Sequence, residues 1–236
     1  MCSNTFLKQK LNFMGIKLTL LSAFFACLFL MSFRGEKKKK VVFFGDSITE
    51  AAVNKGGYID VLQNMIAAKG AADKFELNGA GISGNKIYDL YLRIEKDVLE
   101  KKPDVVVIWV GVNDVWHKAS SNTGTDFDKF GKFYDAVVKK IQANGAKVII
   151  VTPAAIGEKN DYSNAQDGDL NAYSSWMRKY VKENGLGLVD LRFIFHEYSV
   201  AHNPENKDRN ILTTDGVHLN EKGNALVAEE MWKALQ

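Results

Sequence analysis

The fold of this chain is decided by the stretch KVVFFGDSIT, residues 40–49. Its four consecutive apolar residues, Val41–Phe44, predict a strand that is buried on both faces, as the strands of parallel sheets are. Gly45, Asp46 and Ser47 follow, and all three residue types are common in tight turns. The stretch therefore predicts a buried strand that ends in a strand-to-helix turn, with a serine exposed at the edge of the sheet.

The same order of strand and helix repeats along the rest of the chain. Short apolar or β-branched runs predict four further strands, at residues 75–77, 105–110, 147–151 and 188–189. Apolar residues at helical spacing predict helices at residues 58–68, 87–99, 127–143, 170–182 and 221–235. Such alternation predicts one α/β domain built on a five-stranded parallel sheet, with helices on both faces.

Two long segments, residues 152–169 and 192–215, are predicted to be loops. Loops of this length in compact domains are often functional. In an open parallel sheet, ligands bind beyond the carboxyl ends of the strands. We therefore expect the functional residues to lie where the strands end and in these loops.

The length of 236 residues suits a single domain, and its charge gives little sign of a polyanionic partner. The formal net charge is +3, but residues 1–35 hold four basic side chains and no acidic one, which leaves 27 basic and 28 acidic side chains in residues 36–236. The one dense basic cluster, Lys37–Lys40, precedes the first strand and is interpreted as a solvated flank. We therefore expect no binding of nucleic acid.

Residues 1–35 have the order of an export signal, with basic residues up to Lys17, the apolar run Leu18–Phe33, and polar residues after it. A run of 16 residues is shorter than the roughly 20 that span a membrane as a helix, which favours a cleaved signal peptide over an uncleaved membrane anchor. Cys27 suggests a lipoprotein, but the apolar run continues beyond it. We expect an exported domain, residues 36–236, that is periplasmic, extracellular or anchored to the envelope.

The chemistry of residues 36–236 does not involve thiols. Both cysteines, Cys2 and Cys27, lie in the leader. Disulfides, cysteine-bound metal and catalysis by a thiol are therefore excluded from the domain.

Candidate catalytic groups follow the first three predicted strands. Ser47 follows the first, and the glycines of residues 78–84 follow the second, where they let backbone amides approach a ligand. The Gly-x-Gly-x-x-Gly spacing there also occurs in dinucleotide sites, but no acidic residue ends the next strand. Asn113 follows the third strand after Gly111, and its side-chain amide can donate a hydrogen bond to an oxyanion.

The last candidate pair, Asp215 and His218, precedes the final helix. An aspartate three residues before a histidine can fold back in one turn and fix the imidazole tautomer, which leaves the other ring nitrogen free to take a proton from a serine. Among the other histidines, His196 and His202 have no such neighbour.

Together these segments resemble the SGNH hydrolases, also called the GDSL esterase and lipase family. The resemblance covers residues 41 to about 235 and rests on four motifs, namely Gly45-Asp46-Ser47, Gly81 in Gly81-Ile82-Ser83-Gly84, Gly111-Val112-Asn113-Asp114, and Asp215-Gly216-Val217-His218. It implies a flavodoxin-like three-layer α/β/α fold and ester hydrolysis without a metal or cofactor. One departure lies before Gly81, where the family often has Asn two residues earlier but this chain has Asn78 three residues earlier.

By the same resemblance, Ser47 is the nucleophile, His218 is the general base and then acid, and Asp215 orients His218. The amides of Ser47 and Gly81 and the side chain of Asn113 would form the oxyanion hole. Asp46 and Trp116, next to these groups, are candidate substrate-binding residues.

The function we expect is hydrolysis of short acyl esters, with acetylated carbohydrate as the favoured substrate because an exported enzyme meets polysaccharide. Hydrolysis of lysophospholipids or thioesters, or acyl transfer, would use the same groups. A hypothesis of another class is a non-catalytic glycan-binding domain, in which Trp109, Trp116 or Trp176 would stack on sugar rings. The complete set of catalytic residue types favours the enzyme. The oligomeric state is left open.

Overall fold

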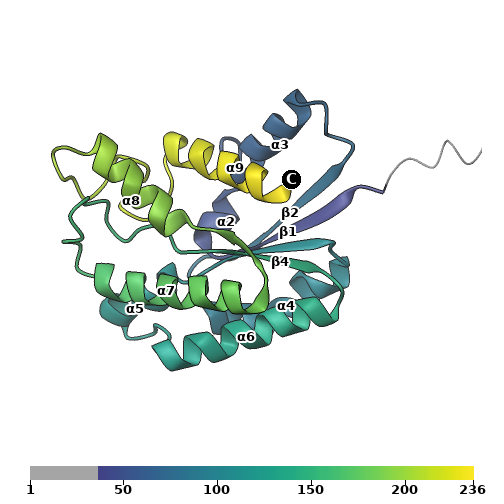
Figure 1. Ribbon diagram of the computed structural model, residues 1–236, viewed down its shortest axis with the longest axis horizontal. Coiled ribbons are helices and arrows are strands. Elements are labelled where there is room, and N and C mark those ends of the chain that lie inside the picture. The colour runs from purple at the N-terminus through teal and green to yellow at the C-terminus, as the bar shows by residue number, and fades with distance from the viewer. Residues whose placement is uncertain (1–36) are drawn as a thin grey trace, which may run out of the picture. The chain divides into compact units, whose positions relative to one another are not determined.

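The computed structural model describes residues 37–236 (Figure 1). Its centre is one sheet of five parallel strands in the order β2-β1-β3-β4-β5. The strands are β1 Lys39–Gly45, β2 Phe75–Gly81, β3 Val105–Trp109, β4 Lys147–Val151 and β5 Gly187–Val189. All five predicted strands are confirmed, and their order is that of the flavodoxin-like folds.

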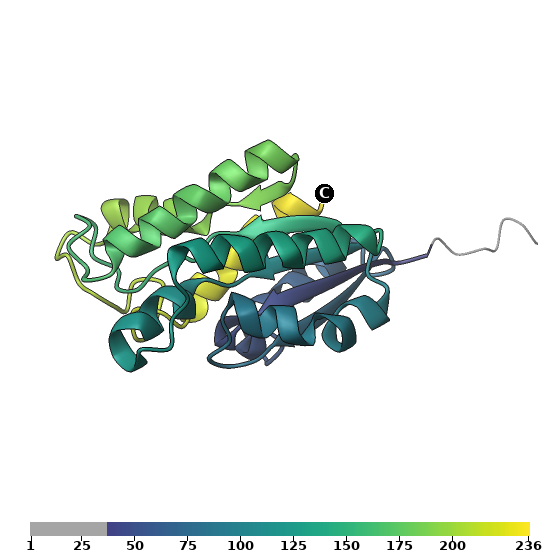
Figure 2. The same cartoon turned by 90° about the horizontal axis from the view of Figure 1, so that it is seen from below.

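Helices cover both faces of this sheet, which makes three layers (Figures 1 and 2). One face carries α2 Ser47–Ala51, α3 Tyr58–Ala68, α8 Leu191–His202 and α9 Glu221–Leu235. The other face carries α4 Ile87–Asp97, α5 Val112–Ser121, α6 Phe127–Ala143 and α7 Asp167–Asn184, and a short 3-10 turn, Leu99–Lys101, follows α4. No helix within residues 37–236 is long and apolar enough to cross a membrane.

Two helices of functional interest were not predicted. The predicted loop at residues 192–215 is wrong in its first part, because α8 extends to His202. Helix α8 buries Leu191, Phe195 and Ser199, which are spaced one helical turn apart, but the exposed apolar residues Phe193 and Val200 hide the pattern. Helix α5 was missed because its four buried residues are consecutive, Val112–Val115, and give no helical period.

The strand register brings the predicted motifs to one edge of the sheet. Gly45, the last residue of β1, is level with Gly81 at the end of β2 and with Trp109 at the end of β3. The segments that follow these three strands therefore lie side by side at the carboxyl edge. The apolar residues of β1, Val41–Phe44, are fully buried, so this edge is fixed on the core of the domain.

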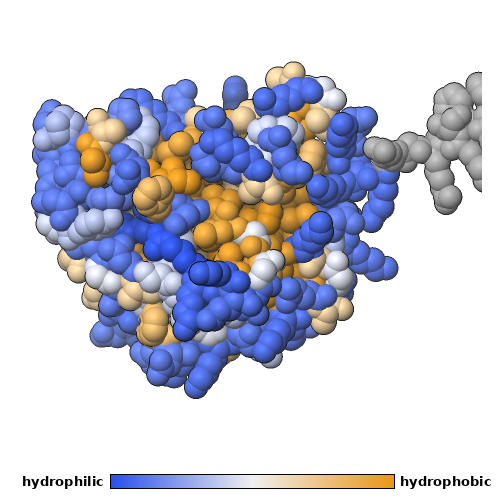
Figure 3. All heavy atoms as spheres, in the orientation of Figure 1, coloured by the Kyte–Doolittle hydropathy of each residue, from blue (hydrophilic) through white to orange (hydrophobic). Residues whose placement is uncertain are grey.

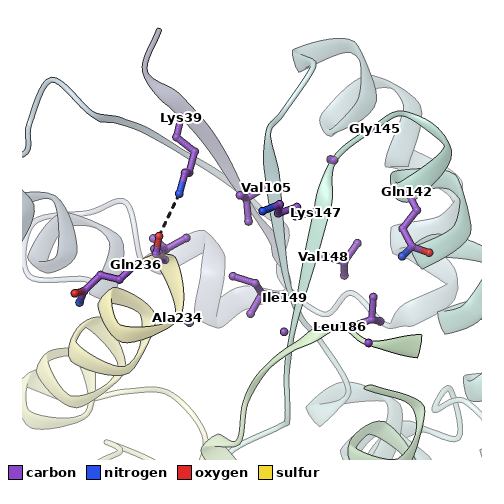
Figure 4. A pocket seen from close by; sticks show the side chains of 14 residues that line it. Lys39, Val105, Gln142, Gly145, Lys147, Val148, Ile149, Leu186, Ala234 and Gln236 are labelled. Atoms are coloured by element: carbon purple, nitrogen blue, oxygen red, sulfur yellow. Dashed lines mark hydrogen bonds between the residues drawn. The ribbon is translucent and has the colours of Figure 1, made fainter. Parts of the chain in front are cut away.

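The opposite, amino edge carries a hollow of about 640 Å³ (Figure 4). It is lined by the first residues of β3 and β4 and by the end of α9, and Lys39 Nζ donates to the carbonyl of Leu235 at 3.3 Å across its rim. Figure 3 shows the surface in the orientation of Figure 1, and apolar side chains gather there between α9 and the edge of the sheet. This hollow lies at the other end of the strands from Ser47.

Candidate active site

Ser47 stands at the point where β1 turns into α2. The carboxylate of Asp46 caps α2 by accepting the amide of Ile48 at 3.0 Å, so Ser47 is the first helical residue. Gly45 is required before it, because a Cβ there would overlap the side chain of Thr49 and the carbonyl of Trp109. The turn is therefore tight, and it leaves Ser47 partly exposed above a buried strand.

The structure brings Ser47, His218 and Asp215 into one chain of hydrogen bonds. Ser47 Oγ lies 2.9 Å from His218 Nε2, and His218 Nδ1 lies 2.7 Å from Asp215 Oδ2. Because an ionised carboxylate only accepts, the proton on the ring belongs on Nδ1, which leaves the Nε2 lone pair facing the serine hydroxyl. The side chains of His218 and Asp215 are 40% and 44% exposed, so a substrate can reach them from solvent.

Asp215 is held in its charged form by the turn that carries it. Its Oδ1 accepts the amides of Val217 at 2.9 Å and of His218 at 2.7 Å. Partial burial acts to raise the pKa of Asp215, but the hydrogen bonds from the His218 ring and from these two amides outweigh it and hold the pKa below its usual range. The fold-back predicted from the three-residue spacing is thus the one observed.

Gly81 lies directly against the turn that contains Ser47. A Cβ at Gly81 would overlap the backbone of α2 at Asp46, Thr49 and Glu50, so only glycine permits this approach. The departure from the family pattern before Gly81 is the position of Asn78, three residues earlier. Strand β2 continues through Gly81, and the Asn78 side chain points along the strand to Glu76, 3.2 Å away, instead of shaping a turn.

Asn113 stands in the first turn of α5, directly after β3. The chain enters α5 through Gly111, whose φ of +132° favours glycine. Asn113 is only 3% exposed, and its Nδ2 donates one hydrogen bond to the carbonyl of Asn85 at 3.2 Å. Its second N–H has no acceptor among the residues that the structure describes. An amide donor is therefore free at the carboxyl edge where Ser47 and Gly81 also lie.

The two candidate substrate-binding residues occupy different positions. Asp46 is 2% exposed and lies beneath the turn of Ser47, capping α2, so its carboxylate does not face a substrate from outside. Burial raises the pKa of Asp46 to about 7, against the opposing effect of the hydrogen bond from Ile48. Trp116 is partly exposed on α5, one turn after Asn113, and lines a hollow beside Asp215.

The other two tryptophans that were considered for sugar stacking lie elsewhere. Trp109 is 3% exposed and packs against Tyr58, and Trp176 packs among Phe130, Tyr134 and Tyr180. Within residues 37–236, no group of three or more His, Cys, Asp or Glu side chains is arranged to hold a metal ion.

Residues 43–226 match the GDSL-like lipase/acylhydrolase family. The chain belongs to this family. A crystal structure of an acetyl xylan esterase, AlAXEase, is 61% identical, with a TM-score of 0.83 over 84% of this chain and 100% of that chain. An acetylxylan esterase of Geobacillus stearothermophilus is 26% identical over 206 residues, which are 80% of this chain and 90% of the relative.

A further structure agrees with these matches. LAE5, an α/β hydrolase enzyme from the metagenome of Lake Arreo in Spain, is 27% identical with a TM-score of 0.73, over 83% of this chain and 94% of that chain. The resemblance to SGNH hydrolases and the α/β fold are confirmed. This GDSL hydrolase is a carboxylic ester hydrolase.

Sequence reasoning missed Glu158, which holds the segment that carries Asp215 and His218. Glu158 is 3% exposed, and its carboxylate accepts the backbone amides of Ile211, Leu212 and Thr213 at 2.9, 2.6 and 3.1 Å. Next to it, the amide of Gly157 donates to the carbonyl of Gly216 at 2.9 Å. No motif marks Glu158, because an acidic residue in a predicted loop is usually solvated.

Arg93 of α4 was also missed, and it holds the ends of β1 and β2 in this GDSL hydrolase. One Nη donates to the carbonyls of Gly45 at 2.7 Å and Ala80 at 3.0 Å. Its guanidinium carbon also lies 4.6 Å from the ring centroid of Phe44. The amphipathic pattern of the helix predicted its apolar face but gave no sign of an arginine that binds strand ends.

Proposed function

We propose that this enzyme hydrolyses acetyl esters of carbohydrates through an acyl-enzyme formed on Ser47. The observation that carries the proposal is the hydrogen-bond chain from Ser47 through His218 to Asp215, with 2.9 and 2.7 Å between the bonded atoms. These distances are within the range in which a base can take a proton from a nucleophile.

In the first step, Ser47 Oγ attacks the ester carbonyl and its proton passes to His218 Nε2. The charge that develops on the imidazole is balanced by Asp215, whose pKa is held low. The negative charge on the carbonyl oxygen is stabilised by the amides of Ser47 and Gly81 and by the free N–H of Asn113. His218 then gives its proton to the leaving alcohol, and the acyl group stays on Ser47.

In the second step, a water molecule enters where the alcohol left. His218 takes a proton from the water as it attacks the acyl carbonyl, and the same three donors stabilise the second oxyanion. Collapse breaks the bond to Ser47, and its oxygen regains the proton from His218. The products are a carboxylic acid and the free enzyme, and no group other than these side chains and amides is required.

The choice of an acetyl group on a carbohydrate is supported by the relatives. The 61% identical structure is that of an acetyl xylan esterase, and it is matched along its whole length. The curated relative from Geobacillus stearothermophilus is an acetylxylan esterase as well. Lysophospholipase, thioesterase and acyltransferase activities would use the same catalytic groups, and they make different predictions for chain length and acceptor.

The test is hydrolysis of p-nitrophenyl esters from acetate to long acyl chains, by residues 36–236 and by the Ser47→Ala variant. We expect turnover that is highest for acetate and is lost in the variant, with the folded state preserved in circular dichroism. A preference for long acyl chains would replace the acetyl assignment with a lipid ester. Activity that survives in Ser47→Ala would overturn the mechanism.

The cellular location of the enzyme belongs to the same proposal. The leader in residues 1–35 lies outside the described residues, and its apolar run Leu18–Phe33 supports export of the domain as a cleaved product or an anchored one. Fractionation of cells that express the full chain, followed by mass measurement of the protein, tests this. A full-length protein in the cytoplasm would contradict it.

A further inference from the structure

Two hollows flank the turn that carries Asp215 and His218, and they differ in chemistry. One, of about 360 Å³, borders Asp215 and Val217 and has Trp116, Lys159 and Asp208 in its wall. The other, of about 520 Å³, borders His218 and Ile48 and has no Phe, Tyr or Trp in its wall. Both are within the size range of small-ligand sites. Which part of an ester enters each hollow depends on the side chains that line it.

The smaller hollow combines an aromatic surface with polar groups. Trp116 comes from α5, three residues after Asn113, and residues at this spacing share one side of a helix. The aromatic side chain is therefore next to the donor of the proposed oxyanion hole. Across the hollow, the loop of residues 156–165 supplies Lys159 and Asn164, and Asp208 comes from the segment before Asp215.

The polar groups of this hollow are not equally available to a ligand. Asn164 Nδ2 is bonded to Asp167 at 2.9 Å, and Asp208 is bonded to Arg209 at 2.9 and 3.1 Å. The Lys159 side chain has no hydrogen-bond or ion-pair partner among residues 37–236. An ammonium group with three donors thus stands in the wall beside two side chains that are already bonded within the protein.

We propose that this hollow, the Trp116–Lys159 hollow, binds a neutral pyranose ring of the alcohol part of the ester. A pyranose has an apolar C–H face, which suits the indole of Trp116, and hydroxyl groups on its rim, which can accept from Lys159. An acyl chain would bury the ammonium group of Lys159 without giving it a partner, which costs free energy. The proposal rests on the proposed function, because it identifies what binds beside the reacting ester.

Binding in this hollow contributes to catalysis as well as affinity. The ring would be held one helical turn from Asn113 and next to Asp215, so contacts to the sugar fix the position of the acetyl group at Ser47. Binding energy from a part of the substrate that does not react can be used to orient the part that does. A sugar acetate should therefore depend on Trp116 and Lys159 more strongly than p-nitrophenyl acetate, which lacks the sugar.

The experiment compares kcat/KM for two esters, p-nitrophenyl acetate and a methyl β-xylopyranoside that carries one acetyl group. We expect Trp116→Ala to lower kcat/KM for the sugar acetate by about 10- to 30-fold and Lys159→Met by about 10-fold. Both variants should lose less on p-nitrophenyl acetate than on the sugar acetate, so the ratio of the two kcat/KM values is the readout. Trp116→Phe should restore most of the loss, because it keeps an aromatic face. Lys182→Met, exposed in the last turn of α7 and outside both hollows, is the matched control and should change neither value.

The outcomes separate this proposal from the proposed function. If the wild-type enzyme hydrolyses p-nitrophenyl acetate through Ser47 but not the sugar acetate, the binding site and the carbohydrate assignment are both wrong, and only the esterase mechanism stands. If it hydrolyses both esters, and Trp116→Ala and Lys159→Met leave the sugar acetate unaffected, the binding site is wrong and the proposed function stands. Equal losses on both esters would also overturn the site, because they would show a general effect on the active centre. Hydrolysis of neither ester by the wild-type enzyme would overturn the proposed function itself.

Discussion

The serine and the histidine of this site are positioned by two different kinds of structure. Ser47 follows a central strand, and Gly81 and Asn113 come from the ends of the two strands that pair with it, so backbone register sets their relative positions. His218 ends an irregular segment that begins after α8, and side chains such as Glu158 hold this segment by its backbone amides. The serine side is thus built by regular structure and the histidine side by buried polar contacts.

This difference predicts how each side responds to mutation. On the serine side, a polar side chain can be removed without disturbing the strands, because their hydrogen bonds and apolar packing remain. On the histidine side, the buried polar side chain is itself the support, so its removal should affect stability and activity together. The following predictions test this contrast, beginning with the largest effect on turnover.

Asn113→Ala, on the serine side, removes one of the three proposed oxyanion donors. We expect kcat for p-nitrophenyl acetate to fall by about 10²–10³-fold, as in enzymes that lose one such donor. The melting temperature should change little, since Asn113 makes one hydrogen bond, to the carbonyl of Asn85. Steady-state kinetics and thermal melts measure both quantities, and unchanged turnover would remove Asn113 from the mechanism.

Glu158→Ala, on the histidine side, leaves the amides of Ile211, Leu212 and Thr213 without their acceptor. Each unsatisfied buried group costs about 1–3 kcal/mol, so the free energy of unfolding should fall by several kcal/mol. We expect kcat/KM per folded molecule to fall by about 10- to 100-fold, because the segment before Asp215 loses its support.

The controls for this variant are Glu158→Gln and Glu197→Ala. Glu158→Gln keeps an acceptor oxygen and should lie between the wild type and Glu158→Ala in both measurements. Glu197 is exposed on α8, and its replacement should leave stability and activity unchanged. A Glu158→Ala protein with the melting temperature and turnover of the wild type would contradict the contrast, because the histidine side would then not depend on this buried polar side chain.

Asp46→Asn should have the smallest effect on turnover, and its effect on stability should depend on pH. Burial raises the pKa of Asp46 from 3.8 to about 7, so the folded protein binds the proton more tightly than the unfolded chain. The stability that this group contributes is fully present below about pH 4 and is lost as the pH rises toward 7. The variant cannot ionise, so its melting temperature minus that of the wild type should increase between pH 4 and pH 8. A constant difference would show that Asp46 does not titrate in this way.

The same contrast explains what could be predicted from the sequence. The serine side was predicted in detail, because Val41–Phe44 and Val105–Trp109 are continuous apolar runs and the residues after them meet by the rules of parallel sheets. The local pair Asp215 and His218 was predicted from spacing alone. The contacts that bring this pair to Ser47 could not be predicted. Glu158 acts across more than 50 residues on backbone amides, and these have no sequence signature.

We propose that Ser47 is the nucleophile and that His218 activates it. The most direct measurement is covalent labelling with a fluorophosphonate, followed by mass spectrometry of the peptides. We expect a single adduct on the peptide that contains Ser47, with labelling abolished in Ser47→Ala and slowed by at least about 10²-fold in His218→Ala. An adduct on another residue, or labelling of Ser47 at the wild-type rate without His218, would contradict it.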